Sequence, residues 1–180
     1  EVIPGQWEYQ IGYRGFKEDV ISVLRVCDEL WLSRWLLHRI SEDFGFHVSF
    51  SNKPIKGDWN GAGLHTNFST KNMRCSKLGR KTIEKAISRL ADKHQEHIKL
   101  YGEDLGERLT GQFETAPIDV FSWGVGSRDT SIRMPLQVSK LGYGYIEDRR
   151  PGANADPYII ASRIITSIEA LSENKIWSKE

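Results

Sequence analysis

Residues 59–70 read WNGAGLHTNFST, and this stretch indicates the kind of sheet that the chain builds. After two glycines, His65, Asn67 and Ser69 stand at every second position. Because the side chains of a strand alternate between its two faces, these three polar groups share one face. A solvated hairpin edge tolerates such a row. The glycines just before it permit positive φ or a close backbone approach, which favours a ligand-facing loop.

Alternation of the same kind recurs along the chain and predicts further strands. Residues Gln6–Ile11 alternate polar with large apolar side chains, and FHVSFS (46–51) alternates again. The stretches TSIRMP (130–135) and GYGYIEDRR (142–150) read as two more strands. Each of these segments has one face for a core and one polar face.

Three amphipathic helices are predicted between and after the strands. The first has Asp28 as its N-cap and stops at Gly45, and the second covers roughly residues 79–101. The third begins with Asp156 as its cap and Pro157 at its first position. Strands with a polar face, separated by helices and long loops, favour an α+β fold, in which helices cover one side of an antiparallel sheet.

Length and composition are those of one soluble globular domain. The chain has 180 residues and a formal net charge of +1, which gives no general attraction to nucleic acid or to an anionic membrane. No apolar run approaches the roughly 20 residues that span a bilayer. Cys27 and Cys75 lack metal-type spacing, so we expect a reduced, cytoplasmic protein.

In the last predicted strand, the charged residues are divided between the two faces. Tyr145, Glu147 and Arg149 share one face, and we expect Arg150 to turn with Asp148 to the other. An acid beside a guanidinium on a strand is just as often a surface salt bridge, which contributes little to stability. Strand parity therefore predicts different roles for two adjacent arginines.

Acidic and imidazole side chains on polar strand faces form a candidate metal site: Glu1, Glu8, His65 and Glu147. A Pro-Gly pair before the first strand allows a bulge that turns the first two to one side. Carboxylates with one imidazole suit Mg²⁺ or Mn²⁺ better than Zn²⁺. Several arginines cluster in the last two fifths of the chain: Arg108, Arg128, Arg133, Arg149 and Arg150. Guanidinium groups beside such metals are what phosphoryl transfer requires.

Two other features of the sequence are candidates for a functional role. His94 and His97 lie three residues apart on the second helix, but they lack an acidic or cysteine partner at helical spacing, so ordinary helix-face histidines are the better interpretation. Residues 102–117 are too rich in glycine and charge for a core segment. Loops of this length are often functional.

Five stretches, in order, resemble one known family. They are EVIPGQWEYQIG (1–12), KGDWNGAGLHTNFSTKNMR (56–74), RLTGQFET (108–115), SIRMP (131–135) and GYIEDRRPGANADPY (144–158). Each resembles a signature of glutamine synthetase, the eukaryotic-type branch especially. The resemblance implies that residues 1–180 are part of a catalytic domain with a curved antiparallel sheet, a half-barrel, and helices on its outer face. The family's amino-terminal β-grasp domain and first catalytic strands are not in this sequence.

The resemblance also implies an activity. In the family, ATP phosphorylates the γ-carboxylate of L-glutamate, and ammonia displaces phosphate from the γ-glutamyl phosphate to give L-glutamine, with Mg²⁺ or Mn²⁺ bound. The enzyme is a homo-oligomer of stacked rings, and the amino-terminal domain of a neighbouring subunit completes each active site. The resemblance therefore implies that this chain is inactive by itself.

The family's site residues carry over onto matching positions. Those implied to bind metal are Glu1, Glu8, His65 and Glu147. Those implied to bind glutamate are Asn60, Gly61, Arg108, Arg128 and Arg149. Those implied to bind the nucleotide are Asn67, Ser69, Arg128, Arg133 and Tyr145. Those implied to act in catalysis are Glu114, Arg128, Arg133 and Arg149. Glu114 matches the flap acid that closes over glutamate and takes a proton from ammonium.

Two other interpretations stay open. A relative that joins glutamate to methylamine or a polyamine is disfavoured only modestly by Glu114. A non-enzymatic structural or regulatory homologue is free to lose metal ligands, yet every ligand expected within this sequence is present. The chain also departs from the family: residues 13–27 are longer than the usual link, and Phe113 replaces a histidine often found before the flap glutamate.

Overall fold

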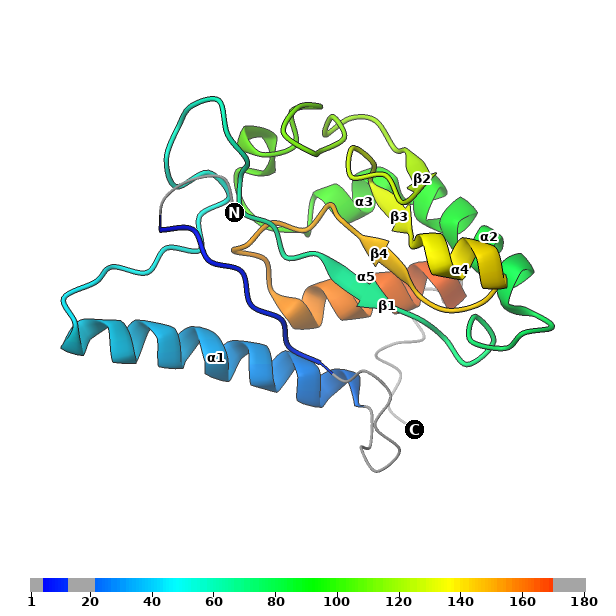
Figure 1. The fold of residues 1–180 in the computed structure, drawn as a ribbon, viewed down its shortest axis with the longest axis horizontal. Coiled ribbons are helices and arrows are strands. Elements are labelled where there is room, and N and C mark those ends of the chain that lie inside the picture. The colour runs from blue at the N-terminus through cyan, green and yellow to red at the C-terminus, as the bar shows by residue number, and fades with distance from the viewer. Residues whose placement is uncertain (1–4, 13–21, 170–180) are drawn as a thin grey trace. The chain divides into compact units, whose positions relative to one another are not determined.

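The structure, a computed structural model, describes residues 5–12 and 22–169 (Figure 1). The chain divides into two compact units, Glu1–Phe50 and Ser51–Glu180. Within the described residues, no helix is both long enough and apolar enough to cross a membrane.

The first unit contains one long helix, α1 (Val23–Asp43). Ser22 is its N-cap and accepts a hydrogen bond from the backbone N of Arg25 (3.4 Å). The prediction that Asp28 caps this helix is therefore wrong, because the sequence before Asp28 contains no helix breaker and the first capping hydroxyl lies further upstream. The predicted stop is confirmed, since Gly45 has φ +67° directly after the C-cap.

The alternation at Gln6–Ile11 does not form a strand in the structure. Trp7, on the face expected to be buried, is 90% exposed. The second alternating segment, 46–51, also lacks strand structure. Alternation shows only that a segment can present two faces, whereas a strand needs a partner that supplies its hydrogen bonds. No such partner pairs with these segments within the described residues.

The second unit is built on a four-stranded open sheet. Its strands, in spatial order, are β1 (Thr66–Phe68), β4 (Ile146–Asp148), β3 (Ile132–Met134) and β2 (Trp123–Val125). β4 is antiparallel to both of its neighbours, but β2 and β3 are parallel. The α+β class is confirmed, and the expectation of a wholly antiparallel sheet is wrong for this pair. The chain turns at Gly126 (φ +67°) and re-enters the sheet in the same direction after residues 126–131.

Two helices cover one face of this sheet, α2 (Gly79–Asp92) and α5 (Pro157–Glu169) (Figure 1). The buried cluster between helices and sheet includes Ile83, Ile87, Leu90, Ile132, Met134, Ile146, Ile160 and Ile164. Ile146 is the first residue of β4, so the residue after it, Glu147, projects from the opposite face. Packing of the helices therefore fixes which face of the sheet is left for polar chemistry.

The predicted helix over 79–101 is two helices, because α2 ends at Asp92 and α3 (His94–Ile98) follows a break at Lys93. The remaining short elements are a 3₁₀ turn (Leu105–Glu107) and α4 (Leu136–Leu141). The predicted start of the last helix is confirmed, since Asp156 Oδ1 accepts hydrogen bonds from the backbone N of Tyr158 (2.8 Å) and Ile159 (3.4 Å).

The first residue of α2 provides a test of this packing. Alanine ordinarily favours a helix over glycine. A Cβ on Gly79 would lie only 2.4 Å from Tyr143 Cβ and 2.7 Å from Gly142 O. We therefore expect Gly79→Ala to destabilise the protein by about 1–3 kcal/mol. Ser88→Ala, on the exposed side of the same helix, is the control and should leave the melting temperature unchanged or slightly raised. A higher melting temperature for Gly79→Ala would contradict the packing.

Candidate active site

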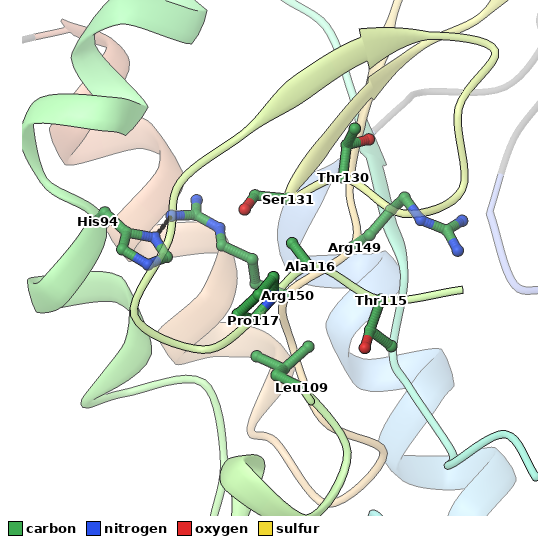
Figure 2. Close-up of a pocket in the computed structure, with 9 residues that line it drawn as sticks. All are labelled: His94, Leu109, Thr115, Ala116, Pro117, Thr130, Ser131, Arg149 and Arg150. Atoms are coloured by element: carbon green, nitrogen blue, oxygen red, sulfur yellow. Dashed lines mark hydrogen bonds between the residues drawn. The ribbon is translucent and has the colours of Figure 1, made fainter. Parts of the chain in front are cut away.

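The charged residues of β4 and its continuation project alternately from two faces. Arg149 Nη1 donates to Glu147 Oε1 (3.1 Å), and Arg150 donates to both oxygens of Asp148 (2.9 and 2.7 Å). Figure 2 shows the Arg149 and Arg150 side chains leaving the backbone in opposite directions. The prediction from strand parity is confirmed.

Glu147 lies at the centre of a polar row that crosses three strands. Its register partners are Asn67 on β1 and Arg133 on β3. Arg133 Nε lies 2.5 Å from Glu147 Oε2, and His65 Nδ1 lies 3.2 Å from Glu147 Oε1. The contact with Arg133 is an ion pair without the angles of a hydrogen bond. Within the described residues, Glu147 Oε2 therefore has no hydrogen-bond partner.

The surroundings of this row keep Glu147 ionised and His65 neutral. Burial by itself raises the pKa of Glu147, but the hydrogen bond from His65 and the charges of Arg149 and Arg133 outweigh it and hold the pKa below 4.5. Burial, with Arg108 and Arg149 nearby, lowers the pKa of His65 below 6.5, despite the opposing effect of Glu147. A carboxylate and a neutral imidazole are the protonation states that a cation needs in its ligands.

The side chain of Arg108 packs closely against the two glycines that precede β1, Gly61 and Gly63. Its Nη2 donates to Arg149 O (2.9 Å) and contacts His65 Nε2 (2.8 Å). A Cβ on Gly63 would lie 2.5 Å from Arg108 Nη2, and one on Gly61 would lie 2.5 Å from Asn52 O and 2.8 Å from Arg108 Cγ. The close approach that these glycines permit is thus to a buried arginine of the same chain, whose pKa burial and Arg149 lower to about 10. Glutamate binding by Gly61 and Arg108 stays a prediction.

Residues 110–116, hereafter the flap, carry the predicted catalytic acid. Phe113 (φ +54°) and Glu114 (φ +62°) both have left-handed backbone conformations. Glu114 Oε1 accepts from Arg128 Nη1 (2.8 Å), and its Oε2 accepts from Asn60 Nδ2 (3.4 Å). The carboxylate is exposed, as predicted, but the flap is better packed than predicted, because Thr115 and Ala116 are buried.

Arg149 connects the flap to the sheet. Besides Glu147, it donates through Nη2 to Glu114 O (3.2 Å) and through Nε to Arg128 O (3.0 Å). One guanidinium therefore positions the flap acid, the loop that carries Arg128 and the central carboxylate. This structural role was not evident from the sequence.

The remaining predicted nucleotide residues lie around the end of β1 and the start of β4. Arg74 Nη1 donates to Ser69 Oγ (2.7 Å) and to Ser69 O (3.0 Å). Arg74 and Tyr145 also line an open, largely apolar groove of about 310 Å³ together with Pro135, Gln137, Val138, Leu141, Tyr143 and Gly144. Arg74 is not among the residues predicted from the sequence, although it ends the KGDWNGAGLHTNFSTKNMR stretch that contains Asn67 and Ser69.

Two predicted metal ligands are not placed beside the others. Glu1 lies outside the described residues, and Glu8 belongs to the first compact unit. Across the part of the chain that the structure describes, no three acidic, histidine or cysteine residues gather as a metal site. The structure brings together His65 and Glu147, a carboxylate and an imidazole whose donor atoms suit Mg²⁺ or Mn²⁺, and Arg133 pairs with Glu147 Oε2. The four-residue metal site stays a prediction.

A second cavity, about 10 Å³, lies beside Arg149 and Arg150 (Figure 2). It is lined by His94, Leu109, Thr115, Ala116, Pro117, Thr130 and Ser131 as well. This volume holds about one water molecule. The cavity is therefore part of the packing behind the flap and is not a substrate site.

A buried hydrogen-bond network supports β4 from the helical side. Tyr101 OH donates to Asp148 Oδ2 (2.9 Å), and His97 contacts both Tyr101 OH (2.5 Å) and Ser167 Oγ (2.7 Å). His94 Nδ1 lies 3.2 Å from Arg150 Nη1. The two histidines are thus interior hydrogen-bonding groups, and the interpretation that they are not a metal pair agrees with these contacts.

The chain is similar in sequence to known proteins along its whole length. The family described as "Glutamine synthetase, catalytic domain" matches residues 1–176. The chain is 52% identical to "Glutamine synthetase" of Eremothecium gossypii, over 100% of this chain and 47% of that protein. It is 54% identical to that of Neurospora crassa, over 96% and 46%. It is 50% identical to "Glutamine synthetase 1, mitochondrial" of Drosophila melanogaster, over 92% and 40%. The chain thus spans about half the length of these relatives.

A solved structure shares the fold. The cryoEM structure of Plasmodium falciparum glutamine synthetase matches 82% of this chain and 30% of its own, with a TM-score of 0.64 and 23% sequence identity. At this identity the likeness supports the arrangement of helices and sheet only.

The buried histidine behind β4 makes stability depend on pH. Burial holds the pKa of His97 at about 3, compared with an ordinary value of 6.5. Between these values the unfolded chain binds a proton that the folded chain excludes, so stability must fall as the pH falls. From pH 7 to pH 5 we expect His97 to account for a loss of about 2 kcal/mol in the free energy of unfolding.

Urea unfolding of wild type, His97→Asn and His47→Asn at both pH values measures this contribution. His97→Asn should lose less stability between pH 7 and pH 5 than wild type, and the exposed control His47→Asn should behave as wild type. Equal losses of stability in all three proteins would show that His97 is not the source of the pH dependence.

Proposed function

The chain belongs to the glutamine synthetase catalytic-domain family, and from that premise we propose that the full-length protein joins ammonia to L-glutamate at the expense of ATP. The observation that carries the proposal is the face of the sheet around Glu147. There a buried carboxylate, His65 and two arginines meet, and Arg149 links them to the acid of the flap. Such a face suits phosphoryl transfer, which depends on positioning and on neutralising charge.

Each group has a proposed task in making a γ-glutamyl phosphate. His65 and Glu147 would hold a divalent cation, Mg²⁺ or Mn²⁺, which when bound neutralises phosphate charge. Arg133 and Arg149 would stabilise the charge that builds on the transferring phosphoryl group. The groove beside Arg74 and Tyr145 would receive the nucleotide, since its lining is largely apolar with few polar groups.

The second step would use the flap. Glu114 is the exposed carboxylate of the flap, and it contacts both Asn60 and Arg128. Once substrates displace these partners, the carboxylate can accept a proton from ammonium. Ammonia then attacks the acyl carbon of the γ-glutamyl phosphate, the C–O bond to phosphate breaks, and inorganic phosphate leaves. A larger amine substrate would need the same proton acceptor, so Glu114 does not distinguish it from ammonia. We propose ammonia as the substrate on the basis of the family resemblance.

The assembly and the compartment are also proposals. We propose a homo-oligomer of stacked rings in which a neighbouring subunit completes each site, so that this chain alone has no activity. Within the described residues, Cys27 and Cys75 form no disulfide, which fits a reducing compartment, and we propose the cytoplasm.

Replacing the flap acid tests the second step. In the full-length protein, Glu114→Gln should lower kcat for the ammonium-dependent reaction about 10²–10⁴-fold, the usual contribution of a positioned proton acceptor. The KM for ATP should change little. Glu107→Gln, which removes a partly exposed acid close to the flap, is the matched control and should leave kcat near wild type. Unchanged turnover of Glu114→Gln at neutral pH would exclude this role.

The two adjacent arginines separate catalysis from stability. Arg149→Lys should lower turnover, because lysine cannot reproduce the forked hydrogen-bond donors of a guanidinium group. The expected loss of transition-state stabilisation is about 2–4 kcal/mol. Arg150→Lys should mainly lower the melting temperature, because Asp148 is fully buried and would lose its bidentate partner. Turnover and melting temperature of both variants give the comparison. Small and equal losses of turnover would mean that the Arg149 pair is only structural.

A further inference from the structure

The flap touches a second loop of the same unit, residues 51–62, at two points. The Lys53 ammonium lies over the Phe113 ring, 5.0 Å from its centroid. Asn60, at the other end of this loop, donates to Glu114 Oε2. Lys53 Nζ also donates to the backbone carbonyl of Trp59, immediately before Asn60. One ammonium therefore contacts both the flap and the segment that leads to Asn60.

The flap conformation needs such support. Phe113 and Glu114 are consecutive non-glycine residues with positive φ, a strained arrangement that persists only where surrounding contacts hold it. Arg149 holds the backbone on the Glu114 side through Glu114 O, and Thr115 Oγ1 donates to Arg108 O (3.2 Å) and Gln112 O (2.8 Å). On the Phe113 side, the Lys53 ammonium contacts the ring. An attraction between a cation and an aromatic face supplies the support there.

Lys53 differs from a neighbouring lysine that does behave as a surface charge. Lys56 lies in the same loop, its side chain is 82% exposed, and it pairs with Glu107 (3.1 Å). Lys53 is half-buried, and its ammonium is shared between a carbonyl and an aromatic ring. A solvated lysine needs neither contact. The chain thus offers its own matched control for removing a positive charge from this loop.

We propose that Lys53 is a positioning residue for Glu114, which acts through the Phe113 ring to hold the flap acid in place beside Asn60. This inference deepens the proposed function and rests on it for the role of Glu114. The contact itself does not depend on that function, so it can be measured without substrates.

Hydrogen exchange of the flap tests the contact directly. The backbone N of Thr115 donates to Gln112 O (3.2 Å), so its exchange reports flap opening. In the full-length protein without substrates, Lys53→Met and Phe113→Leu should each speed exchange in the peptide covering 111–116 about two- to fivefold, the effect of losing a partly exposed cation–aromatic contact. Lys53→Arg and Phe113→Trp keep a cation and a ring and should exchange as wild type. Lys56→Met should also exchange as wild type.

The other outcomes overturn the proposal. Wild-type exchange in Lys53→Met shows that the ammonium does not hold the flap. Faster exchange in Phe113→Leu alone shows that the ring packs without the cation. Equal acceleration in Lys53→Met and Lys56→Met shows a general effect of charge.

Steady-state kinetics then connect the contact to the proposed reaction. Lys53→Met should raise the KM for ammonium and lower kcat about two- to fivefold, with the KM for ATP unchanged and with rescue by Lys53→Arg. If the protein has no ammonia ligase activity, the proposed function fails while the exchange result still stands. If activity is present and the exchange result is negative, only the role of Lys53 fails.

Discussion

The buried ion pair of Asp148 and Arg150 is the interaction on which the site depends. Both side chains are fully buried, so each charge requires the other, and the bidentate geometry satisfies both. Burial by itself raises the pKa of Asp148, but the charge and hydrogen bonds of Arg150 outweigh it and hold the pKa below 3.8. Tyr101 and His97 extend the pair toward α5. Because Glu147 and Arg149 alternate with these two residues, anchoring one face of β4 fixes the direction of the other.

The same alternation concentrates positive charge on the polar face. Arg108, Arg133 and Arg149 all lie close to Glu147 or His65, so the face holds more guanidinium groups than carboxylates. A surplus of this kind is costly in an empty site and favourable when phosphate oxygens are present. The neutral state of His65 follows in part from the same arginines, which disfavour a further positive charge. This distribution of charge supports the proposed binding of an anionic, phosphate-bearing ligand at this face.

The side chain of Arg149 joins the flap to this face through a backbone carbonyl oxygen. Arg149 donates to carbonyl oxygens on the flap and on the loop that carries Arg128, so one residue contacts the central carboxylate and both loops. Glu114 itself is held by ion pairing at an exposed position, where such contacts are weak and exchange readily. A firmly held backbone with a loosely held carboxylate is suited to an acid that must change partners during a reaction.

The sequence by itself determined the features that depend on neighbours along the chain. The α+β class, the separation of Arg149 from Arg150, the Asp156 cap and the stop at Gly45 all follow from periodicity and local backbone chemistry. The tertiary structure decided the rest: the parallel pairing of β2 and β3, the missing strand at Gln6–Ile11, the break at Lys93, and the partners of Gly63 and Lys53. The partners of Gly63 and Lys53, Arg108 and Phe113, lie far away along the chain. A local pattern specifies which faces a segment presents, but the residue that meets each face is set by the packing of the whole unit.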